Sequence, residues 1–337
     1  GIMRSECYVT NVVNARPPNN DLSAWVAFKK KDITSAHVAL RDKWVLPIVR
    51  DGYEALLREI ELVKPNIIIT FGNFSMWALT GKWGILKWRG SMLRGTDPDF
   101  PKDWTTANAN WTRPDKNVRV IPTIHPAAIL REWGYRAIAL LDLRRAKKYI
   151  AMDYRSPQWE FSIRPSFDKV MEILVSLRQS ARHRLPPGEL WLDLDIETRA
   201  GHIACLGLSW TPQHALIIPF MCVEKLEGYW SLHEETEIIN QLRILLTSKE
   251  VKIRWQNGLY DAQYIYRHWH FIPHGAQDTM IAHHSCFAAL PKGLSFLASM
   301  YAEWYVFWKD EGKTWQAGMG EDQLWFYNGQ DCVYTRV

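Results

Sequence analysis

The stretch WLDLDIET, residues 191–198, alternates apolar and acidic side chains in the pattern of a β-strand with one buried face. Because successive side chains of a strand point to opposite faces, Asp193, Asp195 and Glu197 are expected to share one face. Burying several anions costs several kcal/mol each unless a positive charge neutralises them. The stretch therefore predicts a nearby cation or, as the simpler alternative, an edge strand whose acids face water.

Two later segments carry polar residues at helical spacing. In RWQNGLYDAQYI, Asn257 precedes Asp261 by four residues, at the start of an expected helix. In WFYNGQDCVYT, Tyr327 and Asp331 lie four apart and hence on one helix face. Each pair alone is weak evidence, but their order after the acidic strand is more specific. Such a carboxylate set can hold two Mg²⁺ or Mn²⁺ ions for phosphodiester hydrolysis, and these metals would be the missing cation.

The three segments together resemble the DEDD superfamily of 3′–5′ exonucleases, in the subgroup with tyrosine in the third motif. They look most like the proofreading domain of family A DNA polymerases. The resemblance covers about residues 185–337 and includes QDTMIAHH after the second motif and PKGLSFLASMYAEWYVFWKDEGKTW before the third. It implies a ribonuclease H-like, DnaQ-like domain of the α/β class with a mixed sheet.

This resemblance also implies roles for individual residues. The metal ligands, which are also catalytic, would be the four acids of the motifs: Asp195, Glu197, Asp261 and Asp331. Among them, Asp195 would bridge the two metals and Asp261 would act through water. Tyr327 would orient the attacking water and is the fifth catalytic residue. Asn257 is expected to bind DNA, whereas Asp193 lies outside the matched set and is expected behind the ligands or facing solvent.

The first half carries motifs of another kind. YVTNVVNARPPNN, KPNIIITFGNFSMWALTG followed by WRG, and PTIHPAAILR resemble the iron–sulfur branch of the uracil-DNA glycosylase superfamily. The resemblance implies an α/β domain with a parallel sheet, incomplete at its start, and places Asn11, Gly72 and His125 near a flipped-base pocket. The alternative for His125 is a turn histidine that caps a helix.

The departures from this family predict an inactive glycosylase. The family carries cysteine where this chain has Ala15, and Cys7 alone cannot hold an iron–sulfur cluster that needs four ligands. The family's glycine-rich, water-activating motif has no counterpart before Tyr8. We therefore expect no iron–sulfur cluster and no uracil excision.

Strand and helix patterns divide the chain into two expected domains. Apolar strand-like runs alternate with helical ones in the first half, and one strand is expected within residues 6–16, before Pro17. The mixed, proline-containing segment AMDYRSPQWEFSIRPSFDKV places the boundary near residue 150, giving domains 1–150 and 151–337. The turn LPPG precedes the acidic strand. An antiparallel meander is predicted from three strand-like runs that short turns separate: ELWLDLDIET, HIACLGLSW and HALIIPF.

Composition narrows the class of protein. The 337 residues contain no apolar run of the roughly 20 residues that a membrane span needs. The five scattered cysteines fit a reducing compartment rather than a disulfide framework. The net charge is +5, and residues 131–184 hold twelve Lys/Arg against six Asp/Glu. This stretch is either a solvated linker face or a DNA phosphate-binding surface formed by its four central cations: Arg144, Arg145, Lys147 and Lys148.

The leading functional hypothesis is a metal-dependent 3′–5′ DNA exonuclease, the proofreading module of a phage-type family A DNA polymerase. Its partners would be a single-stranded DNA 3′ end or a primer–template, a polymerase domain later in the same chain, and a replisome protein. The expected location is the cytoplasm, that of the host cell if the protein is phage-encoded. The alternatives are an RNase D-like exoribonuclease and a catalytically degenerate DNA-docking module.

Overall fold

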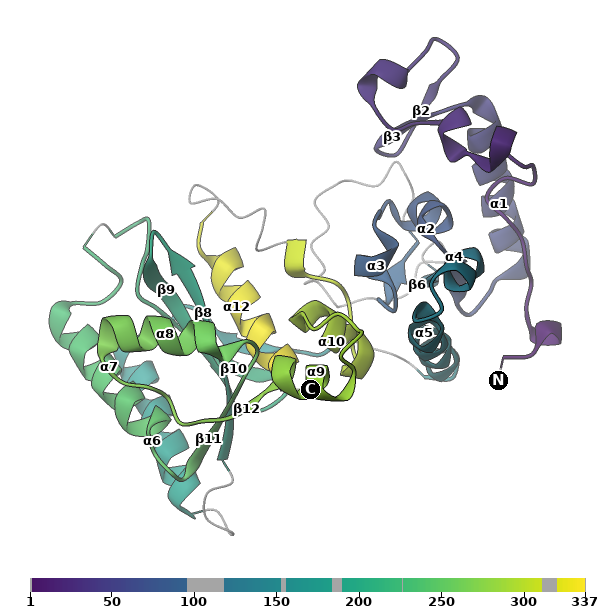
Figure 1. Ribbon diagram of the computed structural model, residues 1–337. Helices are drawn as coiled ribbons and strands as arrows, with labels where there is room; N and C mark the ends of the chain where they lie inside the picture. Colours follow the sequence, from purple (N-terminus) through teal and green to yellow (C-terminus); the bar gives the residue numbers. More distant parts are fainter. Residues whose placement is uncertain are drawn as a thin grey trace. The chain divides into compact units, whose positions relative to one another are not determined.

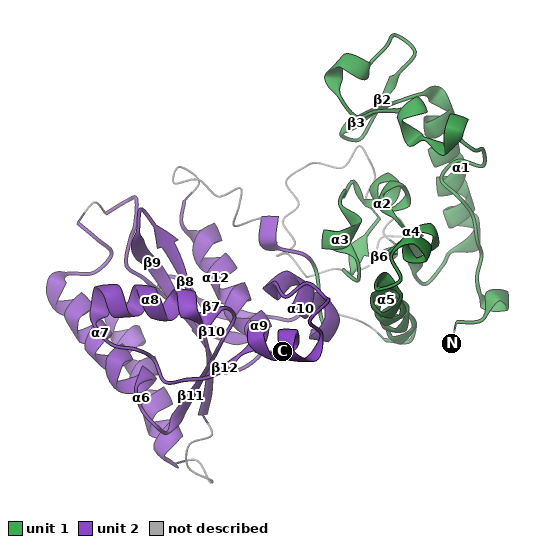
Figure 2. Cartoon of the chain, viewed as in Figure 1, with its two compact units in different colours: residues 1–156, 304–306 green, residues 157–303, 307–337 purple. Residues whose placement is uncertain are grey.

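The chain forms two compact units. The computed structural model describes residues 2–95, 118–152, 156–183, 190–225, 227–310 and 320–336 (Figure 1). Unit 1 comprises Gly1–Ser156 with Trp304–Val306, and unit 2 comprises Pro157–Glu303 with Phe307–Val337 (Figure 2). The LPPG turn expected before the acidic strand lies outside the described residues. No helix in the described ranges is long and apolar enough to cross a membrane.

The centre of unit 1 is a three-stranded sheet with helices around it. Strands β4 and β6 pair in parallel, and β5 pairs antiparallel with β6. The strands and helices of this part are β4 (Ile68–Phe71), α2 (Asn73–Thr80), α3 (Ile85–Trp88), β5 (Leu93–Arg94), β6 (Arg119–Thr123), α4 (Pro126–Arg131) and α5 (Tyr135–Ile150). The parallel pair and the covering helices give the α/β arrangement expected for the first half.

Two turns connect the parallel strands to their helices. After β4, Gly72 has a φ of +85°, which allows the chain to turn directly into α2, and Gly81 in the left-handed region ends that helix. After β6, His125 caps α4: its Nδ1 accepts a hydrogen bond from the Ala127 N–H at 3.1 Å, and Pro126 occupies the first helical position. His125 therefore has the helix-capping contact that the alternative interpretation predicted.

A buried ion pair joins the elements of unit 1. The Arg89 guanidinium donates to both carboxylate oxygens of Asp142, at 2.9 and 2.5 Å, and the Thr123 hydroxyl donates to the same group at 2.8 Å. These residues come from the segment after α3, from α5 and from the end of β6. Gly90 has a φ of +73°, and a Cβ there would lie 2.7 Å from an Asp142 oxygen, so the pair requires glycine at this position.

The remainder of unit 1 is a small antiparallel sheet, a long helix and short helical turns. They are η1 (Arg4–Glu6), η2 (Pro18–Asn20), η3 (Leu22–Ala24), β1 (Val26–Ala27), η4 (Lys30–Asp32), β2 (Val38–Leu40), β3 (Lys43–Val45) and α1 (Pro47–Val63). Trp304–Val306 also belong to this unit, where the Tyr305 hydroxyl donates to the Lys87 carbonyl at 3.0 Å and the Met92 N–H donates to the Tyr305 carbonyl at 2.9 Å.

The strand expected within residues 6–16 is wrong. These residues lie inside the described range 2–95 and are not assigned to a strand. Tyr8 and Val9 are 61% and 65% exposed, while Val12 is buried against α1, where a Cβ on Gly52 would lie 2.5 Å from the Val12 carbonyl oxygen. Val12 thus packs against a helix, whereas Tyr8 and Val9 stay exposed because no neighbouring strand pairs with this segment in the described residues.

Unit 2 is built on a six-stranded mixed sheet in the order β12-β11-β8-β9-β10-β7. Strands β8, β9 and β10 form the expected antiparallel meander, while β11, β12 and β7 pair in parallel with their neighbours. The strands are β7 (Glu160–Ser162), β8 (Leu190–Arg199), β9 (His202–Ser209), β10 (His214–Pro219), β11 (Val251–Trp255) and β12 (Gly275–Asp278). The mixed sheet expected for the second half is therefore confirmed.

Helices cover both faces of this sheet. The helices that the structure describes in unit 2 are α6 (Phe167–His183), α7 (Leu232–Leu246), α8 (Gly258–Trp269), α9 (Thr279–Cys286), α10 (Leu294–Tyr301) and α12 (Asp322–Thr335). Leu192, Leu194 and Ile196 of β8 pack into a core with residues of α6 and α7. The alternate residues of β8 face the other way, toward α12, which contacts β8, β9 and β10. The period of two in the opening stretch therefore separates a hydrophobic face from an acidic face.

Close packing of α12 on the acidic face depends on Gly207 of β9. Gly207 lies opposite Asp195 in the strand register. A Cβ at Gly207 would lie 2.4 Å from Asn328 Oδ1 and 2.6 Å from Cys332 Sγ, both on α12. The absence of a side chain at this position allows the helix to approach the sheet closely, and so sets the distance of the α12 side chains from β8.

We expect Gly207→Ala to destabilise unit 2 by about 1–3 kcal/mol, because the added methyl group overpacks the contact with α12. Chemical denaturation of the purified protein measures this change. Gly293→Ala is the matched control, because a Cβ there meets no atom within 4 Å, and its effect should stay within about 0.5 kcal/mol. Equal stability of the two variants would contradict the proposed role of Gly207.

Candidate functional site

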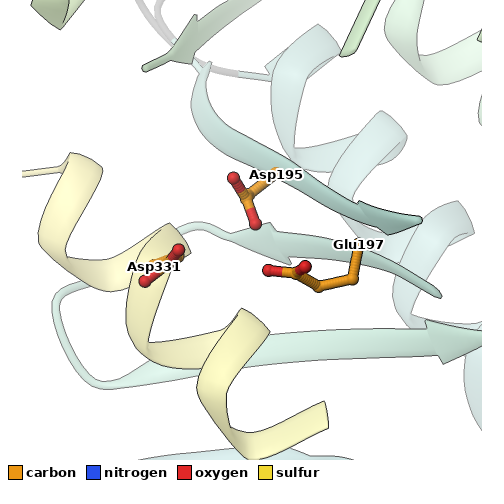
Figure 3. Close-up of side chains that lie close together, drawn as sticks. All are labelled: Asp195, Glu197 and Asp331. Carbon is orange, nitrogen blue, oxygen red and sulfur yellow. The ribbon is translucent and has the colours of Figure 1, made fainter. Parts of the chain in front are cut away.

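Three carboxylates converge between β8 and α12. Asp195 and Glu197 project from β8 toward Asp331 of α12 (Figure 3). One oxygen of each lies within 4.8 Å of one oxygen of each of the others. Asp331 is buried, whereas Asp195 and Glu197 are half-buried. We call these three residues the carboxylate cluster; the structure brings together three of the four acids that the sequence predicts as metal ligands.

Asn328 links the strand and the helix at the cluster. Its side-chain amide donates to Asp195 Oδ2 at 2.7 Å and to the Asp195 carbonyl at 3.2 Å. Asn328 is fully buried and lies on α12, three residues before Asp331. The contact fixes the α12 carboxylate relative to the β8 carboxylates. No sequence motif singled out Asn328, although its spacing within YNGQD places it within one helix turn of Asp331.

Asp261 lies beside the cluster but has another partner. It is buried on the first turn of α8, and its Oδ1 accepts a hydrogen bond at 3.0 Å from the backbone N–H of Ile196. This contact places Asp261 against the peptide between Asp195 and Glu197. Asn257 caps the start of α8 with a left-handed φ of +63°, is exposed, and donates its backbone N–H to Asp278 Oδ1 at 3.2 Å.

Tyr327 and Lys309 complete the surroundings of Asp331. Tyr327 lies on α12 one turn before Asp331, and its hydroxyl accepts a hydrogen bond from Lys309 Nζ at 2.9 Å. The same ammonium donates to Asp331 Oδ2, while the Trp308 indole N–H donates to Asp331 Oδ1 at 2.6 Å. Trp308 and Lys309 were not singled out from the sequence, although both lie in a segment that contributed to the exonuclease resemblance.

With all its carboxylates ionised, the cluster would carry more negative charge than the Lys309 ammonium neutralises. Burial raises the pKa of Glu197 to about 8; the charge of Asp331 adds to this shift and the charge of Lys309 opposes it. Burial also raises the pKa of Asp261 to about 7, despite the hydrogen bond from Ile196. The pKa of Asp195 is raised well above its ordinary value, first by burial and then by Asp331. Buried like charges produce such shifts, and strongly perturbed acids are typical of functional sites.

Asp193 belongs to a separate, fully paired site. It shares the acidic face of β8 but is completely buried, so the alternative that it faces solvent is wrong. Arg254 of β11 donates to its Oδ1 at 2.6 Å, and Arg336 after α12 donates to its Oδ2 at 2.6 Å. Burial raises the pKa of Asp193, and both arginines oppose that shift. The counter-charge of this one carboxylate is therefore supplied by the protein itself.

The residues expected at the glycosylase-like pocket have different environments. Gly72 and His125 are adjacent, because a Cβ on Gly72 would lie 3.3 Å from the His125 Cβ. Asn11 is exposed, and its carbonyl accepts a hydrogen bond from the neighbouring Thr10 hydroxyl at 3.5 Å. The described contacts bring two of the three residues together, and the involvement of Asn11 in a pocket stays a prediction.

The four basic residues predicted to bind DNA lie on α5. Arg144, Lys147 and Lys148 are exposed, as a phosphate-binding surface requires. Arg145 is half-buried, donates to the Gly90 carbonyl at 3.0 Å and lies over the Tyr305 ring at 5.9 Å. Arg145 therefore has a structural contact within unit 1 that the charge count could not reveal.

The first part of the chain is similar to known glycosylases. Residues 1–147 match the family described as the uracil DNA glycosylase superfamily. The chain is 29% identical over 154 residues to a type-4 uracil-DNA glycosylase of Thermotoga maritima, covering 44% of this chain and 59% of that protein. It is 27% identical over 148 residues to the Sulfurisphaera tokodaii enzyme, covering 44% and 53%. The chain thus spans little more than half the length of these relatives.

Solved structures give only distant likenesses. Escherichia coli RNase D, an exoribonuclease involved in structured RNA processing, has 16% identity and a TM-score of 0.34, covering 54% of this chain and 42% of that one. The Trypanosoma brucei RNase D–GMP complex has 16% identity and a TM-score of 0.37, covering 53% and 55%. At these scores the likeness carries no weight for activity or substrate. The comparisons therefore identify a uracil-DNA glycosylase-like domain at the N-terminal end of this chain.

Proposed function

We propose that unit 2 is a metal-dependent 3′–5′ exonuclease that hydrolyses DNA. The observation that supports this most directly is the carboxylate cluster, with Asp261 beside it and Tyr327 one helix turn from Asp331. Buried acids that are not paired with arginines are costly to keep, and a hydrolytic metal site is a physical reason to keep them. Asp193, on the same strand, is the contrasting case of a buried acid paired within the protein.

The residues present fit divalent cations. Mg²⁺ and Mn²⁺ prefer oxygen ligands, and the cluster offers three carboxylate groups with ligand atoms within 4.8 Å of one another. The cluster would hold the first of two metals, and Asp195 and, through water, Asp261 would help to hold the second. When bound, the metals would lower the pKa of water and stabilise charge on the phosphate.

The chain's own residues would position the reactants. Asn328 holds Asp195 against α12, so that ligands from the strand and the helix keep a fixed separation. Lys309 donates to the Tyr327 hydroxyl, and because an ammonium has no acceptor, the Tyr327 oxygen must accept that bond. The hydroxyl proton of Tyr327 is then left to donate to water or phosphate at the cluster. Tyr327 would thereby orient the attacking water.

The glycosylase-like first unit favours DNA over RNA as substrate. Its relatives are named uracil-DNA glycosylases, and joining such a domain to an exonuclease is consistent with a shared DNA strand. We propose that unit 1 contributes DNA binding without uracil excision and without an iron–sulfur cluster, because Ala15 stands where the family carries a cysteine and such a cluster needs four ligands. A proofreading role beside a polymerase domain is the biological setting that we propose, with primer–template DNA and a replisome protein as partners.

Replacing Asp195 and Glu197 together by Ala should reduce release of nucleotides from a 5′-labelled single-stranded DNA by about a thousandfold or more, because two ligand groups are lost. Gel analysis in Mg²⁺ or Mn²⁺ measures the shortening from the 3′ end. Asp168→Ala with Glu172→Ala, on the exposed face of α6, removes the same charge and should leave the rate unchanged. Undiminished digestion by the cluster variant, or digestion only of matched RNA, would contradict the proposal.

The raised carboxyl pKa values predict a pH-dependent stability of the metal-free protein. Glu197 has an ordinary pKa of 4.5 and a folded pKa of about 8, so the folded state binds its proton more tightly than the unfolded state does. This contribution to stability is complete below pH 4.5 and is lost as the pH rises through about 8. In EDTA, the Tm of the wild type should therefore fall relative to that of Glu197→Gln as the pH rises from 4.5 to about 8. A constant difference in Tm would disprove this expectation.

Replacing Arg144, Lys147 and Lys148 by Gln should weaken DNA binding. If each contacts one phosphate of a single strand, the slope of log K against log[salt] should become shallower by roughly 2. Fluorescence anisotropy with the Asp195→Ala/Glu197→Ala background measures both without digestion. Gln replacements of the exposed Lys29, Lys30 and Lys31, elsewhere in unit 1, are the control of equal charge. Unchanged affinity would contradict a DNA-binding role for α5. Uracil excision is tested separately: alkali-induced cleavage of uracil-containing DNA would show that unit 1 is an active glycosylase.

A further inference from the structure

Lys309 lies at the carboxylate cluster, and neither the sequence motifs nor the comparisons assign it a role there. Its side chain is 22% exposed, and its ammonium contacts two groups of α12: Asp331 Oδ2 and the Tyr327 hydroxyl at 2.9 Å. The ammonium also lies 4.9 Å from the centre of the Tyr327 ring. A cation is thus already in place at the position where a metal and an oriented hydroxyl are needed.

Both oxygens of Asp331 are engaged by consecutive residues. The Trp308 indole N–H donates to Oδ1 at 2.6 Å, and the Lys309 ammonium donates to Oδ2. Trp308 is itself fixed by stacking on Tyr334, with ring centres 4.1 Å apart and an angle of 21° between the rings. The two donors therefore hold the orientation of the Asp331 carboxylate, and one of them adds a full positive charge.

The effect of this charge extends beyond Asp331. Asp195 and Glu197 each place a carboxylate oxygen within 4.8 Å of one of Asp331, the group that the ammonium contacts. The ammonium thus offsets part of the repulsion within the cluster when no metal is bound. A divalent cation bound to Asp331 would meet this ammonium at short range, and two positive charges on one carboxylate repel each other.

We propose that Lys309 is a positioning residue with two opposing effects: its charge competes with the metal for Asp331, while its hydrogen bond directs the Tyr327 hydroxyl. Removing the ammonium should therefore tighten metal binding and slow turnover together. A purely structural lysine would change both in the same unfavourable direction. The proposal rests on the proposed exonuclease function for its second effect only, because metal affinity is measured without substrate.

Lys309→Met removes the charge and keeps most of the chain length, and Lys309→Arg keeps the charge. Calorimetric titration of the full chain with Mn²⁺, without DNA, should show roughly tenfold tighter binding for Lys309→Met, as expected on removing one nearby positive charge. Lys309→Arg should stay near the wild type. In EDTA the Tm of Lys309→Met should fall, and Mn²⁺ should raise that Tm by more than it raises the wild-type Tm. Lys169→Met, on the exposed face of α6, is the control.

Turnover on single-stranded DNA tests the second effect. At saturating Mn²⁺, kcat of Lys309→Met should fall by about tenfold or more with a smaller change in KM, and Lys309→Arg should recover much of it. Equal or weaker Mn²⁺ binding by Lys309→Met would overturn the proposal. If the circular dichroism of Lys309→Met shows misfolding, Lys309→Gln takes its place in both measurements. A wild type that binds Mn²⁺ but digests no nucleic acid would refute the exonuclease function while leaving the competition at Asp331 measurable.

Discussion

The crowding of like charges between β8 and α12 is the constraint on which unit 2 depends. The strand must present acids on one face while its other face fills the core, and the helix must approach closely enough to add a further carboxylate. Gly207 permits that approach by having no side chain, and Asn328 fixes it by binding Asp195. The resulting repulsion is a cost to stability that a bound cation would relieve.

Two buried acids of the described residues differ from the carboxylate cluster in their partners. Asp142 in unit 1 and Asp193 in unit 2 each have arginine on both carboxylate oxygens: Arg89 alone for the first, and Arg254 with Arg336 for the second. Such acids join elements and have no charge left for a ligand. The carboxylate cluster instead has one lysine facing several acids, and this imbalance separates a binding site from a structural ion pair.

Sequence similarity characterises the first unit, and the arrangement of side chains characterises the second. Unit 1 is similar in sequence to named glycosylases, yet its His125 is engaged in capping a helix and its Arg145 in a backbone contact. In unit 2 the side chains themselves form a chemically coherent site. Sequence similarity thus indicates ancestry for the first unit, whereas the arrangement of side chains indicates chemistry for the second.

The sequence by itself determined the α/β class and the antiparallel meander, because strand alternation and helical spacing are local properties, and its resemblance to known exonucleases indicated the acids of which three converge. It wrongly predicted a strand within residues 6–16, since pairing and burial depend on neighbours distant in the chain. Only the tertiary structure decided which acids are neutralised: Arg254 and Arg336 meet Asp193, while Lys309 reaches Asp331. Residues far apart in sequence supply those charges, and their distances follow from folding alone.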